Sequence, residues 1–365
     1  MKTLVIGDLH LGARRGADLL RRGGPLEALT AHVTSGGFTR LVLLGDVVEL
    51  RHGPARDALA AAEPVLRALG EALGAGGEVV LVAGNHDHGL IAPWLRGRGA
   101  RKEPPPLQLD EAAGPRASPL IGRLARAAAP ATVTVRYPGV WLREDVYATH
   151  GHYLDCLTTL PAFERLGAGV MARIEGPVPA RDAVPDDFEA RLAPMYAWLD
   201  ALAESRGGRW SRQQAGASAS AWERLSDAGS RPLKARVLAG LFPFGIRGLN
   251  RAGLGPLSAD ISGEALRDAG LTAIGEVLAR LGIDAPHVVF GHTHRAGPLP
   301  GDAAAPWRTP AGTRLYNGGS WIDDPAVTGR SASSPYWPGR AVELDATGPP
   351  RVVRIVEDLQ RPVDR

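Results

Sequence analysis

Side chains that can ligate a metal or carry a proton gather in five short stretches of this 365-residue sequence. One stretch is Gly84-Asn85-His86-Asp87, in which an amide, an imidazole and a carboxylate follow one another. These groups can ligate a metal, move a proton and orient the proton carrier. Alone, the tetrapeptide is weak evidence, because Asn, His and Asp are also ordinary turn residues after a strand. Its meaning depends on the other four stretches.

Each of the other stretches also follows a short apolar run. They are Asp8-Leu9-His10, Gly45-Asp46-Val47-Val48-Glu49, His150-Gly151-His152 and Gly291-His292-Thr293-His294. Short apolar runs rich in β-branched residues are typical of buried strands. Any one stretch alone is more simply interpreted as a turn with an incidental histidine. Five in succession indicate one site built at the ends of several strands.

The segments between these stretches predict the elements that position the site. We expect strands over residues 2–6, 41–44 and 78–83, and helices over residues 25–35 and 55–73, the second interrupted at Pro64. Strand, loop and helix units in succession imply a parallel sheet, and open sheets of this kind bind ligands at the carboxyl ends of the strands. Asp8, Asp46 and Asn85 should therefore meet along one edge of the sheet.

The rest of the chain predicts further strands and a helical insertion. We expect a hairpin over residues 132–142 that turns at Pro138-Gly139, strands over 145–149 and 287–290, and closing strands of a second sheet over 314–321, 340–344 and 351–357. Residues 94–129 predict a surface loop with a short helix over 120–129. Candidate helices of the insertion are 160–174, 185–204, 219–228, 233–241 and 263–281. We therefore expect a core of residues 1–152 and 286–365 and a mainly helical insertion or cap over 153–285.

The middle of this insertion, residues 204–251, is rich in arginine and ends in an apolar, glycine-rich run. Basic residues beside exposed apolar ones would suit an amphiphilic phosphorylated substrate or an anionic membrane surface. The simpler interpretation, which we favour, is that the Trp and Leu side chains of the segment form its own core.

Composition limits the classes of protein to which the chain can belong. The formal net charge is only +3, which does not predict a dedicated nucleic-acid-binding surface but leaves local patches open. The single cysteine, Cys156, rules out an intramolecular disulfide and a cysteine-rich zinc module. The first strand starts within a few residues of Met1, and no run approaches the ~20 apolar residues of a membrane span. We expect a cytoplasmic protein without an integral membrane segment.

The strand-end residues form a set suited to metal chemistry. They are Asp8, His10, Asp46, Asn85, His86, Asp87, His150, His292 and His294. Oxygen and imidazole ligands without thiolates suit first-row divalent metals, with Mn²⁺ preferred here and Fe, Zn, Ni or Co as alternatives. The set is too large for one ion, so two metal ions are implied. A bridged pair of cations can generate hydroxide near neutral pH and stabilise an in-line phosphoryl displacement.

In order, the five stretches resemble the five signatures of the calcineurin-like metallophosphoesterases. The resemblance covers residues 1 to about 152 and 286 to about 357. It implies an α/β fold of two packed mixed sheets flanked by helices, a four-layer arrangement, with the binuclear site at the sheet edge and a large helical insertion outside the pattern. It also implies hydrolysis of a phosphodiester, pyrophosphate or phosphomonoester by attack of metal-bound hydroxide.

The resemblance further implies a role for each residue of the set. Asp8, His10, Asp46 and His294 would hold one metal, with Asp46 bridging, and Asn85, His150 and His292 would complete the other. His86 would donate a proton to the leaving oxygen, and Asp87 would orient it. Glu49 stands where many members carry Asp, at a position behind the ligands, and we expect little consequence. His52, His88 and His152 have no matched role.

The substrate stays open at this level. The Gly-Asp-x-x-Glu variant and a helical insertion are similar to the UDP-2,3-diacylglucosamine hydrolases, which suggests a lipid-linked or nucleotide-linked phosphate and peripheral membrane contact. The insertion is much longer here, and Asn85-His86-Asp87 replaces the Asn-Arg-Asp common in that branch. One alternative is a metal-dependent nuclease, whose affinity for DNA should fall steeply with salt. Another is an inactive scaffold on the same fold. Against it, clustering so many buried polar groups costs free energy, and an inactive site gains nothing in return.

Overall fold

The computed structural model describes residues 1–100, 102–114, 116–160, 162–205, 246–258, 263–324, 328, 331–357 and 359. Their strands are β1 (Thr3–Ile6), β2 (Arg40–Leu44), β3 (Glu78–Val82), β4 (Asp110–Ala112), β5 (Thr132–Arg143), β6 (Val146–Thr149), β7 (His287–Phe290), β8 (Arg314–Asn317), β9 (Arg340–Leu344) and β10 (Arg351–Arg354). Neighbouring strands follow the order β10-β9-β1-β2-β3-β5-β6-β7-β8, and β4 pairs with β5. Parallel and antiparallel pairs are mixed along this path.

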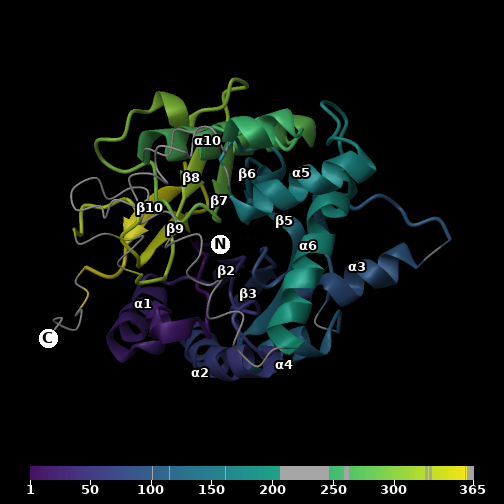
Figure 1. The fold of residues 1–365 in the computed structure, drawn as a ribbon. Helices are drawn as coiled ribbons and strands as arrows, with labels where there is room; N and C mark the ends of the chain where they lie inside the picture. Colours follow the sequence, from purple (N-terminus) through teal and green to yellow (C-terminus); the bar gives the residue numbers. More distant parts are fainter. Residues whose placement is uncertain are drawn as a thin grey trace, which may run out of the picture.

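The helices cover the strands from outside. They are α1 (Gly23–Ser35), α2 (Ala55–Leu73), α3 (Ala92–Gly99), α4 (Pro119–Ala127), α5 (Phe163–Glu175), α6 (Pro185–Ser205) and α10 (Gly263–Arg280), with short 3-10 helices η1 (Arg14–Gly16), η2 (Leu19–Arg21), η3 (His88–Leu90), η4 (His152–Cys156) and η5 (Ala305–Trp307). Figure 1 places α1, α2 and α4 on one side of the strands and α10 on the other. None of the described helices combines the length and the apolar character that crossing a membrane requires.

Alternation of side chains along the strands divides the core into layers. In β1, Leu4 and Ile6 pack with apolar residues of α1, α2 and α4, whereas Val5 points the other way. Val5 shares a cluster with residues of β6, β7 and β8 such as Ala148 and Val289. A third cluster joins the outer face of β7 to α10. Two strand layers therefore pack face to face between helices, which confirms the predicted fold class.

The expected hairpin at Pro138-Gly139 is wrong, because β5 is one continuous strand through both residues. Its first half pairs in parallel with β3, and its second half pairs antiparallel with β6. The Pro-Gly pair marks the place where the strand leaves one layer for the other. A Cβ at Gly139 would lie 2.2 Å from the Tyr147 hydroxyl, so this glycine serves a close approach rather than a turn.

The closing strands are also partly misplaced by the sequence prediction. Of the three expected closing strands, β8 alone joins the second layer, which holds β6 and β7, and it pairs there in parallel with β7. β9 pairs antiparallel with β1 and β10 with β9, so both join the first layer. An alternating apolar strand does not specify which open sheet edge it will cover, because both edges offer unpaired backbone groups.

Most of the predicted helices that fall within the described residues are confirmed. α5, α6 and α10 confirm three of the five expected insertion helices, and the other two, 219–228 and 233–241, lie outside the described residues. α2 runs without a break through Pro64, and both Pro64 and Ala60, whose carbonyl loses its helical hydrogen bond, are exposed. α3 and β4 occupy a region expected to be loop. The division into core and insertion stays a prediction.

Candidate metal centre

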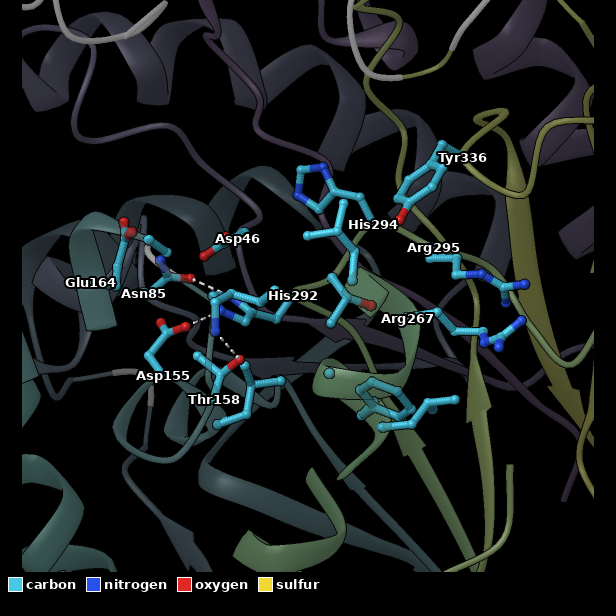
Figure 2. A pocket seen from close by; sticks show the side chains of 18 of the residues that line it. Asp46, Asn85, Asp155, Thr158, Glu164, Arg267, His292, His294, Arg295 and Tyr336 are labelled. Carbon is cyan, nitrogen blue, oxygen red and sulfur yellow. Dashed lines mark hydrogen bonds and ion pairs between the residues drawn. The ribbon is translucent and has the colours of Figure 1, made fainter. Parts of the chain in front are cut away.

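The predicted ligands lie at the carboxyl ends of five strands. Asp8 and His10 follow β1, Asp46 follows β2, Asn85 follows β3, His150 follows β6, and His292 and His294 follow β7. They form two groups in which the possible ligand atoms lie within 4.8 Å of one another. The first is Asp8, His10 and His294, and the second is Asp46, His150 and His292. Figure 2 shows Asp46, Asn85, His292 and His294 around one end of a cavity.

Asp46 connects the two groups. Its Oδ2 lies 3.6 Å from Nε2 of His10 in the first group and 3.4 Å from Nε2 of His150 in the second. His294 closes the first group, because its Nε2 lies 3.3 Å from Asp8 Oδ1 and 3.3 Å from His10 Nε2. Ligand atoms from both groups therefore converge on a single carboxylate.

Five of the predicted ligands adopt a left-handed backbone conformation. The φ angles are 54° at Asp8, 45° at His10, 51° at Asp46, 69° at His292 and 57° at His294. Among the described residues, only one other non-glycine residue, Asp182, has a positive φ. Such conformations cost about 1–3 kcal/mol each and persist where the surrounding structure imposes them, often at functional sites. The strain here is concentrated on the residues that carry the converging atoms.

Two glycines make this convergence possible. A Cβ at Gly45, where φ is +81°, would lie 2.3 Å from the His150 ring. A Cβ at Gly84 would lie 2.3 Å from Asp46 Oδ1 and 2.6 Å from the Asp46 backbone nitrogen. Because neither position has room for a side chain, the strand ends can approach one another closely.

The hydrogen bonds around Asn85 test whether the residues suit a cation. His150 uses Nδ1 to donate to the Leu44 carbonyl, at 3.0 Å, and His292 uses Nε2 to donate to Asp155, at 3.0 Å. When a ring is neutral, its other nitrogen has a lone pair, and both of these nitrogens lie 3.1 Å from the side-chain amide of Asn85. With its nitrogen toward the rings, the amide donates to both imidazoles and to Asp46 Oδ2, the last at 3.2 Å. With its oxygen toward them, the amide joins both ring nitrogens in a set of atoms that can ligate a cation. The residues present fit a divalent metal.

The buried carboxylates favour positive charge at the strand ends, either as a proton on an imidazole or as a cation that displaces this proton. Burial disfavours a charged imidazole, but the hydrogen bond to Glu49 and the Asp46 carboxylate outweigh it and raise the pKa of His10 to about 9. Burial acts in the same direction on His150, and Asp46 again outweighs it, raising the pKa of His150 to about 10. Buried carboxylates thus create a negative potential that holds positive charge at the strand ends.

Comparison with known families identifies this arrangement. Residues 1–215, more than half of the chain, match the model of the calcineurin-like phosphoesterases. The chain belongs to this family. No curated protein matches the sequence. The clusters at the strand ends of this chain therefore occur on the fold of a family of phosphoesterases.

Glu49 makes more contacts in the site than the sequence prediction gave it. One of its oxygens, Oε2, accepts from Nδ1 of His10 at 2.9 Å and from Nδ1 of His86 at 2.8 Å. The other oxygen accepts from the backbone nitrogen of Arg51 at 3.0 Å. Burial raises the pKa of a carboxyl group, but His86 and His52 outweigh it and hold the pKa of Glu49 well below its usual range. One buried carboxylate thus fixes both a predicted ligand and the predicted acid.

Asp87 does not make the contact that the sequence prediction assigned to it. Its Oδ1 accepts from the Gly84 backbone nitrogen at 2.6 Å, and its Oδ2 accepts from the Val47 nitrogen at 2.7 Å. Asp87 therefore ties the loop after β3 to the loop after β2, and Glu49 holds His86. The reason is geometric, because the tight turn after Gly84 directs the Asp87 side chain back toward its own loop.

Two residues of the site were missed by sequence reasoning. Asp155 of η4 holds Nε2 of His292, and Arg51 donates to the Asn85 carbonyl oxygen at 2.7 Å and to Glu164 at 3.1 Å. Neither stands in a recognisable pattern. Asp155 reaches the site because Gly151, with φ 100°, precedes a 3-10 helix that turns the chain back toward β7. The sequence signal for Asp155 was only that an acidic residue stands five positions after His150.

The unassigned histidines have contacts behind the site. His88 Nε2 lies 3.0 Å from Oε2 of Glu189, a buried residue of α6, whose Oε1 accepts from Tyr153 at 2.7 Å and also from Tyr137. His152 Nε2 lies 3.3 Å from the Tyr137 hydroxyl. This polar cluster links α6 to the loops that carry the site.

Proposed function

We propose that this protein is a binuclear metal-dependent phosphoesterase. The observation that supports the proposal best is the position of Asp46, whose Oδ2 lies between the imidazoles of His10 and His150. A carboxylate in this position can bridge two cations. Asp8, His10 and His294 would hold one cation with Asp46, and Asn85, His150 and His292 would hold the other. The mixture of carboxylate, amide and imidazole ligands favours Mn²⁺ or a related first-row metal.

When bound, the cations supply an acidified water nucleophile and neutralise charge on the phosphoryl oxygens. The chain's own residues complete the chemistry. His86 lines the cavity beside Asn85, and 26% of its side chain is exposed to solvent. With Nδ1 held by Glu49, Nε2 is the ring nitrogen left to exchange a proton with the substrate. Burial lowers the pKa of His86 although Glu49 opposes the shift, so the ring would give the proton to a leaving oxygen from its less populated imidazolium form. His86 is therefore the proposed acid of an in-line hydrolysis.

The experiment that tests this proposal measures metal content and turnover together. In Mn²⁺, wild-type protein should hydrolyse nitrophenyl monoesters or diesters. Asp46→Asn should lose both metals and all turnover, because the bridging charge is removed. His86→Ala should keep the metals and lose about 10²–10⁴-fold in kcat, the usual contribution of a general acid.

The results of these measurements distinguish the proposed phosphoesterase from an inactive scaffold and from a nuclease. Full turnover in His86→Ala would refute the acid assignment, and one retained metal in Asp46→Asn would refute the bridge. Two bound metals without turnover of any ester, including single-stranded DNA, would favour the scaffold interpretation. Turnover of DNA alone, with a steep dependence on salt, would favour a nuclease.

A further inference from the structure

A cavity of about 410 Å³ begins at the predicted metal ligands. Asp46, Asn85, His86, His292 and His294 form one end of its wall (Figure 2). Its volume lies within the range of roughly 300–1,000 Å³ that is typical of small-molecule sites. A phosphoryl group bound at the ligands would therefore have the cavity directly beside it.

The remainder of the wall is mainly apolar. Leu154 comes from η4, Leu266 and Leu271 from α10, Phe290 from the end of β7, and Trp307 from η5. Four of these side chains are buried, and Leu266 is half-buried. These elements are separate in sequence and come together in the folded protein, so the apolar wall is a product of the fold.

The positive charges in the wall already have partners. Arg295 donates to Asp302 at 2.7 Å, and its guanidinium lies 5.3 Å from the ring centre of Trp307. Arg267 donates from Nε to Asp268 at 2.7 Å. Figure 2 shows both arginine side chains extending away from the end that holds Asp46 and His292. These arginines are therefore poorly placed to bind a second phosphate near the site.

The negative charges in the wall are paired as well. Asp155 accepts from His292, and Glu164 accepts from Arg51 at 3.1 Å. Among the described lining residues outside the predicted ligand set, each carboxylate and each guanidinium thus has an ion-pair partner. The charged groups therefore need no counter-charge from a ligand, and the apolar surface determines which group binds.

We propose that this cavity binds an uncharged alkyl or aryl group esterified to the phosphate of the substrate. The inference rests on the proposed function, because the proposed metal centre places the phosphate at one end of the cavity. The apolar wall indicates what kind of group is attached to that phosphate. Apolar contact on one side and charge on the other make the substrate amphiphilic. Small hydrophilic phosphates leave the apolar wall unused.

Binding of alkylphosphonates tests this proposal without requiring turnover. The series from methyl- to hexylphosphonate is titrated calorimetrically into Mn²⁺-loaded protein. Each buried methylene strengthens binding about fourfold, from about 0.8 kcal/mol of transfer free energy. Hexylphosphonate should therefore bind at least about 100-fold more tightly than methylphosphonate, with a negative heat-capacity change that reports apolar burial.

Two variants locate the effect in the cavity. Leu266→Gln should reduce the hexyl-to-methyl ratio about tenfold or more, whereas Leu281→Gln, equally half-buried but outside the cavity, should leave the ratio unchanged. Gly270→Leu should reduce the ratio by filling the space, because a Cβ at this α10 position meets only Thr293, at 3.4 Å. Thermal melting of each variant confirms that it is folded.

The outcomes distinguish the two proposals. Hydrolysis of phosphoesters with no dependence of phosphonate binding on chain length would overturn the cavity assignment and leave the proposed function standing. Chain-length dependence without hydrolysis would support the cavity and contradict the function. An equal loss of the ratio in Leu266→Gln and Leu281→Gln would also overturn the cavity assignment, since the effect would then be general.

Discussion

At the scale of single residues, Glu49 carries a prediction that the sequence did not suggest. A carboxylate can accept from His10 and His86 with one oxygen, whereas the amide of Gln must offer either its weaker oxygen or a nitrogen that cannot accept. Glu49→Gln should therefore disturb a predicted ligand and the predicted acid together. We expect metal affinity and kcat each to fall about 10–100-fold, the usual effect of changing a residue that orients a ligand.

The control for this change is Glu343→Gln in β9. Glu343 is likewise buried and lies 2.9 Å from an imidazole, that of His32, but it belongs to another part of the fold. It should leave metal affinity and kcat unaltered. If Glu49→Gln behaves like Glu343→Gln in metal titration and turnover, Glu49 has no orienting role.

What the sequence could predict at this scale was the identity of the strand-end groups. Asp46, His150 and His292 follow apolar runs, and a parallel sheet brings such positions to one edge. It could not predict that Asp87 would turn back to the Gly84 and Val47 amides, because a one-residue change of direction decides that contact. Asp155 was hidden for a similar reason, since the turn at Gly151 determines its position.

At the scale of elements, α6 packs against η3 and places Asp200 beside Gly89. A Cβ at Gly89 would lie 2.9 Å from Asp200 Oδ2, and within the described residues Asp200 Oδ1 has no hydrogen-bond partner. Burial raises the pKa of Asp200 to about 6, although Arg51 and His88 oppose the shift. The carboxyl group is therefore more easily protonated in the folded protein than in the unfolded chain.

A raised pKa of an acid makes stability fall as pH rises. The loss of folding stability caused by ionising Asp200 is absent below the pKa of the unfolded chain, near 3.8. This loss grows as the pH rises from there to the folded-state pKa of about 6, and it is complete above about 6. Asp200→Asn should remove it, so the gain in the free energy of unfolding should be about 1 kcal/mol larger at pH 8 than at pH 5. Urea unfolding at the two pH values measures this difference.

An exposed carboxylate provides the comparison for this prediction. Asp268→Asn on α10 should show no comparable difference between pH 5 and pH 8. A gain for Asp200→Asn that is the same at both pH values would contradict the burial argument and point instead to a change in helix propensity.

The elements themselves were predictable where periodicity was long and uniform. α2 and α6 follow from repeated apolar spacing, whereas β5 was mistaken for a hairpin because Pro138-Gly139 is also a common turn pair. The partner of β9 was not readable for another reason. Strand pairing depends on which sheet edge is open, and that is a property of the assembled fold.

At the scale of the whole molecule, metal binding and folding should be coupled. The two strand layers meet at loops in which Asp8, His10, Asp46, His292 and His294 have strained backbones. Buried carboxylates also repel one another there when no cation is bound. Anything that binds the folded state alone stabilises it, by about 2.7 kcal/mol at a ligand concentration 100 times the dissociation constant.

Chelation should therefore lower the melting temperature. At about 2–4 °C per kcal/mol for a large domain, removal of divalent metal should lower Tm by roughly 5–10 °C, and added Mn²⁺ should restore it. Asp46→Asn serves as the control, because a protein that has lost the bridging carboxylate should show no Mn²⁺-dependent shift. If wild type melts at the same temperature with and without Mn²⁺, the strained loops are held by the protein alone, and their conformation is no longer evidence for a metal centre.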